Sequence, residues 1–271
     1  MLAVNLSEIT NLSEEICIPV EVVGEISAVW LSLNMAEIQQ YIPLFTSPET
    51  EEQAHAAVKA LMDGSDPKGF KMLAVQLCAA LHTRKLYAEK GINDNIFIET
   101  LKSYQRFIGE HFVTYGYYGF DRGWWTYRQL SMRLFRLGVL EFEWRKDKPT
   151  ISVHIPSDAV MTREALDTSY AWAKAFFAQQ GGEYTGMFCS TWLLYPDLKN
   201  ILPSGSRILN FQQDYEILEL QPQAQSIMTQ VFKRKYDDLT QLPEDTHLQR
   251  EIKKLLLQGG NIGNAYGRYK G

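Results

Sequence analysis

Residues 139–177 read VLEFEWRKDKPTISVHIPSDAVMTREALDTSYAWAKAFF, and this stretch decides the fold. Apolar and polar residues alternate over 139–144 and again over 150–156, on either side of a polar turn, which predicts a β-hairpin. A short loop then leads to Thr162, a good N-cap residue for a helix. The apolar face of that helix consists of Leu166, Tyr170, Ala173 and Phe177. The stretch therefore predicts two paired strands followed by a long helix packed on them.

The chain after this helix predicts a mixture of strands and helices. Gly181 and Gly182 end the helix. Strands are predicted over 184–189, 207–211 and 227–232, a short helix over 191–201, and a last helix after the capping box of Thr246 and Gln249. The tail, 259–271, is too rich in glycine to form a helix.

The first half of the chain predicts amphipathic helices. Helix starts are expected at Thr46–Pro48, at Ser65–Pro67 and at Asn93. Residues 115–120, with the sequence YGYYGF, mark a change in composition, because glycine and aromatic residues occur together there. We therefore expect a helical N-terminal domain over 1–117 and a second domain over 118–271. A further helix is predicted over 122–137, with Gly138 as its C′ residue.

Composition limits the class of protein. The 271 residues are 45% hydrophobic and 22% charged, which is the balance of a folded globular chain. The net charge of −5 disfavours a nucleic-acid partner. The three cysteines form no CxxC pair, the five histidines show no metal-binding spacing, and no stretch is apolar enough to span a membrane. We therefore expect a cytoplasmic protein with no metal and no membrane partner.

Three further stretches carry a resemblance to a known family. They are GFDRGWW at 119–125, HIPSD at 154–158 and CSTWLL at 189–194. Together with Leu242–Pro243 and the capping box, they resemble the bacterial acyltransferase-domain proteins. That family joins a helical N-acyltransferase N-terminal domain to a C-terminal domain similar to the GNAT fold of N-acetyltransferases.

The resemblance implies an α+β fold, with a helical N-terminal domain followed by a GNAT-like mixed β-sheet flanked by helices. It also implies an acyl-CoA-dependent N-acyltransferase that moves an acyl group to an amine. The co-substrate would be acetyl-CoA or a longer acyl-CoA, and the acceptor a small-molecule or peptide amine. The order of hairpin, loop and helix over 139–177 agrees with that fold.

The loop before the long helix is the expected CoA site. Unpaired N–H groups at a helix N-terminus attract a pyrophosphate, and Ser157, Thr162 and Arg163 would add hydroxyl groups and a positive charge. The usual acetyl-CoA loop has an Arg/Gln-x-x-Gly-x-Gly/Ala pattern, whereas residues 157–161 contain no glycine. A GNAT-shaped binding or regulatory protein without catalysis is therefore an alternative.

Five side chains are candidates for the chemistry. His154 would be the base that removes the amine proton, with Glu141 or Glu143 as an alternative to it. Cys189 would accept the acyl group, and Tyr195 lies where GNAT enzymes commonly hold the tyrosine acid. The structural alternatives are a histidine bonded within the sheet, exposed strand carboxylates, a buried cysteine and ordinary tyrosine packing.

Substrate contacts are expected from Ser190, which ends a predicted strand, and from the segment before the 122–137 helix. Asp121 and Arg122 form either a buried ion pair that joins the domains or a substrate-facing pair. Trp125 would line an aromatic cleft or cover the junction.

A winged-helix DNA-binding module is a third interpretation. Between 122 and 148 there are seven basic residues and three acidic ones, in an order of helix, strand, basic turn and strand. The alternating strands and helices after residue 156 have no place in such a module, so this interpretation ranks lowest.

Overall fold

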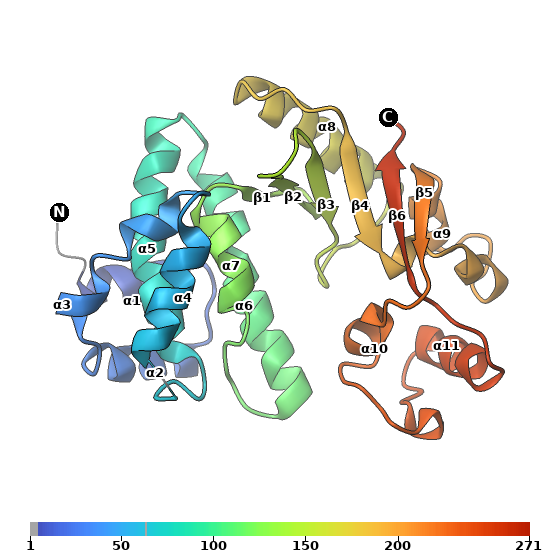
Figure 1. Ribbon diagram of the computed structural model, residues 1–271, viewed down its shortest axis with the longest axis horizontal. Coiled ribbons are helices and arrows are strands. Elements are labelled where there is room, and N and C mark those ends of the chain that lie inside the picture. The colour runs from blue at the N-terminus through green and yellow to red at the C-terminus, as the bar shows by residue number, and fades with distance from the viewer. Residues whose placement is uncertain (1–4, 63) are drawn as a thin grey trace. The chain divides into compact units, whose positions relative to one another are not determined.

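The computed structural model describes residues 5–62 and 64–271 of the chain. The chain forms two compact units, Met1–Leu137 and Gly138–Gly271 (Figure 1). The change from one unit to the next lies further along the chain than the boundary expected between residues 117 and 118.

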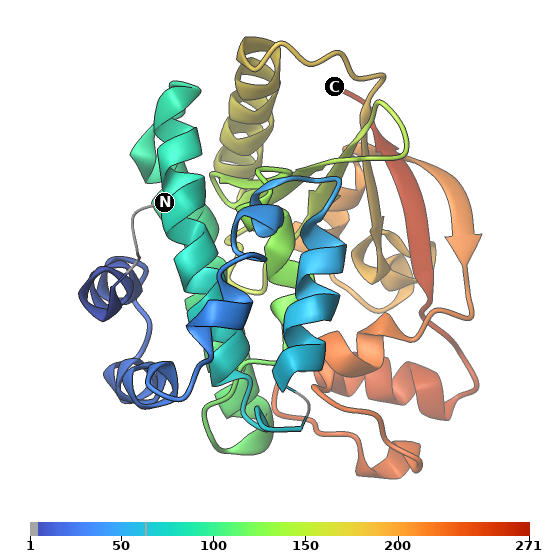
Figure 2. The ribbon, with the colours of Figure 1, turned by 60° about the vertical axis from the view of Figure 1, so that its left-hand side comes forward.

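Unit 1 consists of helices and one short strand. Its elements are α1 (Leu6–Glu15), α2 (Val20–Trp30), α3 (Met35–Ile38), the 3-10 helix η1 (Pro43–Thr46), α4 (Glu51–Met62), α5 (Phe70–Glu89), α6 (Asp94–Tyr115), α7 (Gly123–Leu130) and β1 (Leu134–Leu137). Helix α5 is the centre of this unit, because it packs against α1, α2, α4, α6 and α7. Its residues are apolar and buried around most of its circumference, as expected for a central helix. Figure 2 shows α1 and α2, in dark blue, almost end-on, whereas α4 is seen from its side.

The N-cap predicted at Asn93 is confirmed, since its side chain accepts a hydrogen bond from the amide of Asn95. Two other helices begin later than predicted. Helix α4 begins at Glu51, after a turn in which Ser47 O accepts the amide of Glu51. Helix α5 begins at Phe70, although Asp66 still caps it: its carboxylate accepts the amides of Lys71 and Met72, both at 2.9 Å.

The single helix predicted over 122–137 is wrong in its second half. Helix α7 ends at Leu130, and Leu134–Leu137 form β1. Between them Met132 has a positive φ of 58°, a conformation that no α-helix continues through. Gly138, with a φ of 72°, follows the strand rather than a helix.

Unit 2 is built around a sheet. Its elements are β2 (Leu140–Trp144), β3 (Ile151–His154), α8 (Arg163–Gln179), β4 (Met187–Thr191), η2 (Trp192–Leu194), η3 (Pro196–Asn200), α9 (Arg207–Gln212), β5 (Tyr215–Gln221), α10 (Ser226–Val231), η4 (Leu239–Gln241), α11 (His247–Leu257) and β6 (Asn264–Tyr269). The strands belong to a mixed six-stranded sheet in the order β1-β2-β3-β4-β6-β5. The predicted hairpin is confirmed as the antiparallel pair β2–β3, and only β3 and β4 are described as a parallel pair. The fold is α+β, with a helical N-terminal region followed by a mixed sheet flanked by helices, which excludes the winged helix.

Several predictions in the C-terminal part are wrong. Residues 207–212 and 226–231 are helices α9 and α10, although their apolar runs indicate strands. Ser206 accepts the amide of Ile208 and so caps α9. The strands β5 and β6 were not predicted. Strand β6 contains Gly267, which packs closely against Leu194. A Cβ at this position would lie 3.1 Å from Leu194 Cδ1, so the close packing requires a glycine.

The strand registers give the sheet two different faces. Helix α8 covers the apolar face: the Phe142 ring lies 6.1 Å from that of Tyr170, and the Trp144 ring lies 5.4 Å from that of Phe177. The opposite face is rich in polar residues because alternate residues of each strand point to it. These residues are Glu141, Glu143, Ser152, His154, Phe188, Ser190, Tyr266 and Arg268. No helix among the described residues is both long enough and apolar enough to cross a membrane.

Candidate active site

The parallel strands β3 and β4 separate partway along their length. They are paired only at Ile151 with Met187 and at Ser152 with Phe188. Beyond these pairs β3 stays paired with β2 as far as His154, whereas β4 pairs with β6. The sheet therefore opens between the carboxyl ends of the two strands, where ligands bind in α/β folds. We call this opening the split.

His154 and Ser190 lie on either side of the split, on the same face. His154 is the last residue of β3, and Ser190 lies on β4 two residues after Phe188. The His154 side chain is 26% exposed, and Ser190 is exposed. The structure thus places one predicted base and one predicted substrate contact at the same opening.

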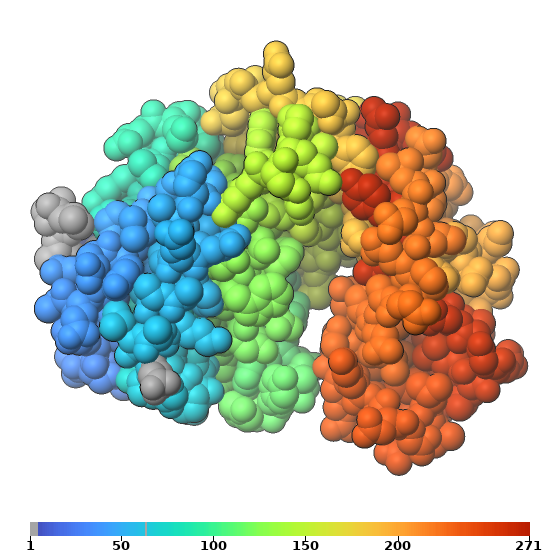
Figure 3. Space-filling model, viewed as in Figure 1, coloured from blue at the N-terminus to red at the C-terminus, as the bar shows by residue number. Residues whose placement is uncertain are grey.

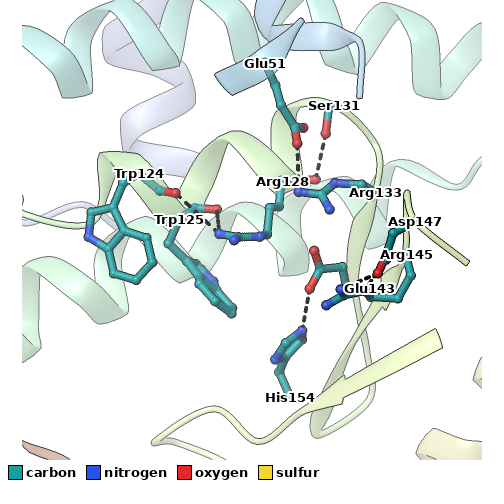
Figure 4. A network of polar contacts seen from close by, with 10 residues as sticks. All are labelled: Glu51, Trp124, Trp125, Arg128, Ser131, Arg133, Glu143, Arg145, Asp147 and His154. Atoms are coloured by element: carbon teal, nitrogen blue, oxygen red, sulfur yellow. Dashed lines mark hydrogen bonds and ion pairs between the residues drawn. The ribbon is translucent and has the colours of Figure 1, made fainter. Parts of the chain in front are cut away.

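Glu143 is the close partner of His154. Its Oε2 lies 2.8 Å from His154 Nε2, and its side chain is only 5% exposed (Figure 4). This contact fixes the orientation of the imidazole ring at the end of β3.

The expectation of exposed strand carboxylates is wrong. Glu141 and Glu143 are only 3% and 4% exposed, and in the register Glu141 lies opposite His154 while Glu143 lies opposite Ser152. Figure 4 also shows the Arg145–Asp147 ion pair in the turn of this hairpin, with Arg145 Nε 2.9 Å from Asp147 Oδ1.

Helix α8 begins with an N-cap at Thr162 and open amides in its first turn, as the sequence predicts. Thr162 is the N-cap, and its hydroxyl accepts the amide of Ala165 at 3.3 Å. The amides of Arg163 and Glu164 have no hydrogen-bond partner within the part of the chain that the structure describes. Ser157, in the preceding loop, is exposed.

The Arg163 side chain is held by two carboxylates. Its guanidinium lies 2.8 Å from Asp214 Oδ1 and 2.7 Å from Asp167 Oδ1, and both partners raise its pKa. Much of its charge is therefore balanced within the protein.

Cys189 and His154 are not brought together. Cys189 points to the α8 side of the sheet, where it is 2% exposed, whereas His154 is on the opposite face. Burial raises the pKa of the Cys189 thiol, so the thiolate that a nucleophile requires is disfavoured. Tyr195 follows η2 and is 8% exposed, and its carbonyl accepts Gln212 Nε2 at 3.1 Å.

In unit 1, Asp121 and Arg122 do form an ion pair, but it is not buried. Arg122 Nη1 lies 3.5 Å from Asp121 Oδ2, and both side chains are about 40% exposed: 41% for Arg122 and 42% for Asp121. Trp125 packs edge-on against Trp124 with ring centroids 5.9 Å apart, and the Arg128 guanidinium lies 4.3 Å from the Trp125 ring (Figure 4).

Two features of the polar face were not foreseen. The sequence predicts Glu143 only as an alternative base, because the alternation of the hairpin indicates a shared face but not the register. Tyr266 lies opposite Ser190 and stacks on Phe188 with ring centroids 5.5 Å apart, in a segment for which no strand was predicted.

The burial of the cysteines gives a direct prediction for thiol labelling. Cys17 is exposed, whereas Cys78 and Cys189 are buried, and burial raises the pKa of Cys78 to about 12. In the native protein we expect iodoacetamide at pH 8 to label Cys17 within minutes and the other two only after unfolding. Peptide mass spectrometry measures this, and rapid native labelling of Cys189 would contradict the buried position.

A model of the N-acyltransferase N-terminal domain matches residues 7–132, and a model of the GNAT-like C-terminal domain matches residues 134–269. No curated protein matches the chain.

Solved structures of acyltransferases share the fold. One, in complex with decanoyl-CoA and teicoplanin, is 23% identical with a TM-score of 0.79, over 96% of this chain and 86% of that one. Another, in complex with CoA and 10C-teicoplanin, is 25% identical with a TM-score of 0.79, over the same shares of 96% and 86%. The family models and the fold agree, and the chain belongs to the family that joins an N-acyltransferase N-terminal domain to a GNAT-like C-terminal domain.

Proposed function

We propose that the protein is an acyl-CoA-dependent N-acyltransferase that moves an acyl group to an amine. The observation that carries the proposal is the His154–Glu143 pair, 2.8 Å apart, beside the split between β3 and β4. The similar acyltransferase structures, in complexes with decanoyl-CoA or CoA, support acyl-CoA as the co-substrate.

In this proposal the thioester lies in the split with its carbonyl carbon near His154. The open amides of Arg163 and Glu164 face the pyrophosphate, and the hydroxyls of Ser157 and Thr162 bind phosphate oxygens. The Arg163 guanidinium contributes less than a free cation because Asp214 and Asp167 hold it.

The chemistry is a direct transfer. The amine nitrogen attacks the thioester carbonyl and forms a C–N bond, while its proton passes to the imidazole of His154. The tetrahedral intermediate then breaks its C–S bond, and the CoA thiolate takes a proton from the Tyr195 hydroxyl. No acyl-enzyme is needed, which agrees with the burial of Cys189.

The acceptor is a small-molecule or peptide amine. Ser190 is exposed on the same face as His154, and it is the proposed acceptor contact within unit 2. Asp121, Arg122 and Trp125, the other predicted substrate contacts, belong to unit 1, and all three retain exposed surface.

The glycine-free loop before α8 favours a second candidate, a GNAT-shaped binding protein without catalysis. The backbone approach that glycines allow in the usual loop is restricted here by side chains at every position of 157–161.

A turnover experiment distinguishes the two. The protein is incubated with acetyl-, octanoyl- or decanoyl-CoA and a panel of primary amines, and both free CoA thiol and acylated amine are measured. We expect protein-dependent formation of both products in equal amounts. Saturable binding of acyl-CoA without turnover on any amine would support the binding protein, and absence of binding would contradict both candidates.

A further inference from the structure

A cavity lies at the other end of β4 from the split. It has a volume of about 530 Å³ and is formed entirely by unit 2, where β4 begins and β6 ends. In Figure 1 this is the end of the sheet marked by the letter C, and in Figure 3 the red end of the chain reaches the surface there between gold and orange segments. Its charged lining residues are Lys174, Glu216, Arg268 and Lys270.

The three cations of this cavity are not neutralised by carboxylates. Lys174 Nζ lies 5.4 Å from the centroid of the Tyr269 ring, Lys270 Nζ donates to the carbonyl of Gln213 at 2.9 Å, and Arg268 Nη2 donates to that of Thr185 at 3.5 Å. Within residues 5–62 and 64–271, none of the three lies within 4.0 Å of an acidic oxygen. Glu216 is the one acidic side chain in the lining, and with the α-carboxylate of Gly271 it makes two negative groups against three cations, so positive charge is in excess.

These cations differ from Arg163, whose guanidinium is balanced by Asp214 and Asp167. Lysine and arginine side chains only donate hydrogen bonds, so a ligand that joins all three must bring acceptor oxygens and negative charge. A phosphate group has both, and it also suits the planar arrangement of donors on Arg268.

The cavity is larger than a phosphate group, and two tyrosines, Tyr184 and Tyr269, form part of its wall. Their rings offer apolar surface to the organic part of a ligand. We propose that this cationic cavity binds a phosphate-bearing small molecule, with the phosphate held by Lys174, Arg268 and Lys270. The proposal does not depend on the acyltransferase function, because the cavity and the split lie at opposite ends of β4.

Binding of inorganic pyrophosphate to the full chain tests the proposal. Calorimetric titration at constant ionic strength is carried out on the wild type, Lys174→Met, Arg268→Gln and the control Lys199→Met. Lys199 is an exposed lysine of unit 2 that does not line the cavity. We expect saturable binding to the wild type and to the control, and about tenfold weaker binding to each cavity variant, as expected for the loss of one charge-assisted hydrogen bond.

Either of two results would overturn the proposal: no saturable binding to the wild type, or cavity variants that bind as tightly as the control. A second titration in the presence of saturating CoA identifies the source of the phosphate. Unchanged pyrophosphate binding would assign the cavity to a free phosphate ester, and competition would assign it to the phosphates of CoA itself.

Discussion

The His154→Ala variant is expected to lose about 10²- to 10⁴-fold in kcat/KM for acyl transfer, the usual contribution of a positioned general base. The imidazole lies at the end of β3, where its Nε2 is 2.8 Å from Glu143 Oε2. The matched control is His247→Ala, because His247 is an exposed histidine of the same unit at the start of α11. Initial rates of CoA release with a fixed amine measure both variants.

The Glu143→Gln variant tests whether the negative charge of Glu143 matters in addition to its role in orienting His154. The amide keeps a hydrogen-bonding group near Nε2 but removes the negative charge, so we expect an activity loss of about 10- to 100-fold, which corresponds to one hydrogen bond to a charged group. Initial rates of CoA release measure this variant beside the wild type, and full activity in Glu143→Gln would show that the charge of Glu143 is not needed. Activity within threefold of wild type in His154→Ala would remove this histidine from the mechanism.

Gly69→Ala is expected to lower the free energy of unfolding of unit 1 by about 3 kcal/mol or more. Gly69 has a φ of +76°, and a Cβ there would lie 1.8 Å from the carbonyl oxygen of Phe120. The backbone at Phe120 cannot easily shift away from Gly69, because the Phe120 amide donates a hydrogen bond to Lys68 O at 2.7 Å. A side chain at this position would therefore push apart two segments that are fixed to each other.

Gly91→Ala is the matched control for this variant. Its φ is +66°, yet nothing lies within 4 Å of the added Cβ, so only the backbone cost of about 1 kcal/mol is expected. Urea denaturation followed by circular dichroism measures both. Equal destabilisation by the two substitutions would show that the close approach to Phe120 has no energetic weight.

The elements that local sequence determines were predictable. The hairpin shows a clean alternation, and Thr162, Asn93 and Thr246 act as N-caps at the predicted positions. Each of these signals involves residues only a few positions apart, so no knowledge of the tertiary structure is needed.

The elements that tertiary packing determines were not predictable. Residues 207–212 and 226–231 are apolar enough for strands, but they form helices. Strand β5 exposes most of its side chains, and β6 contains a glycine that packs against Leu194, so neither shows a strand pattern. Gly138 indicated a helix end, although the positive φ of Met132 ends the helical region earlier.

The site was partly predictable for the same reason. Strand ends identify His154 and Ser190, because ligand sites of such sheets lie at carboxyl ends. The partnership of Glu143 with His154 depends on the register of β2 and β3, which alternation alone does not define. The engagement of Arg163 by Asp214 depends on a contact between residues 51 positions apart.

Hydrogen–deuterium exchange with and without octanoyl-CoA tests most directly whether the split and the start of α8 hold the acyl donor. The account predicts slower exchange of the amides over 153–165 and 189–191 on addition of the thioester, with unit 2 otherwise little changed. Binding that leaves these amides unprotected, or that protects only segments elsewhere in the chain, would contradict it.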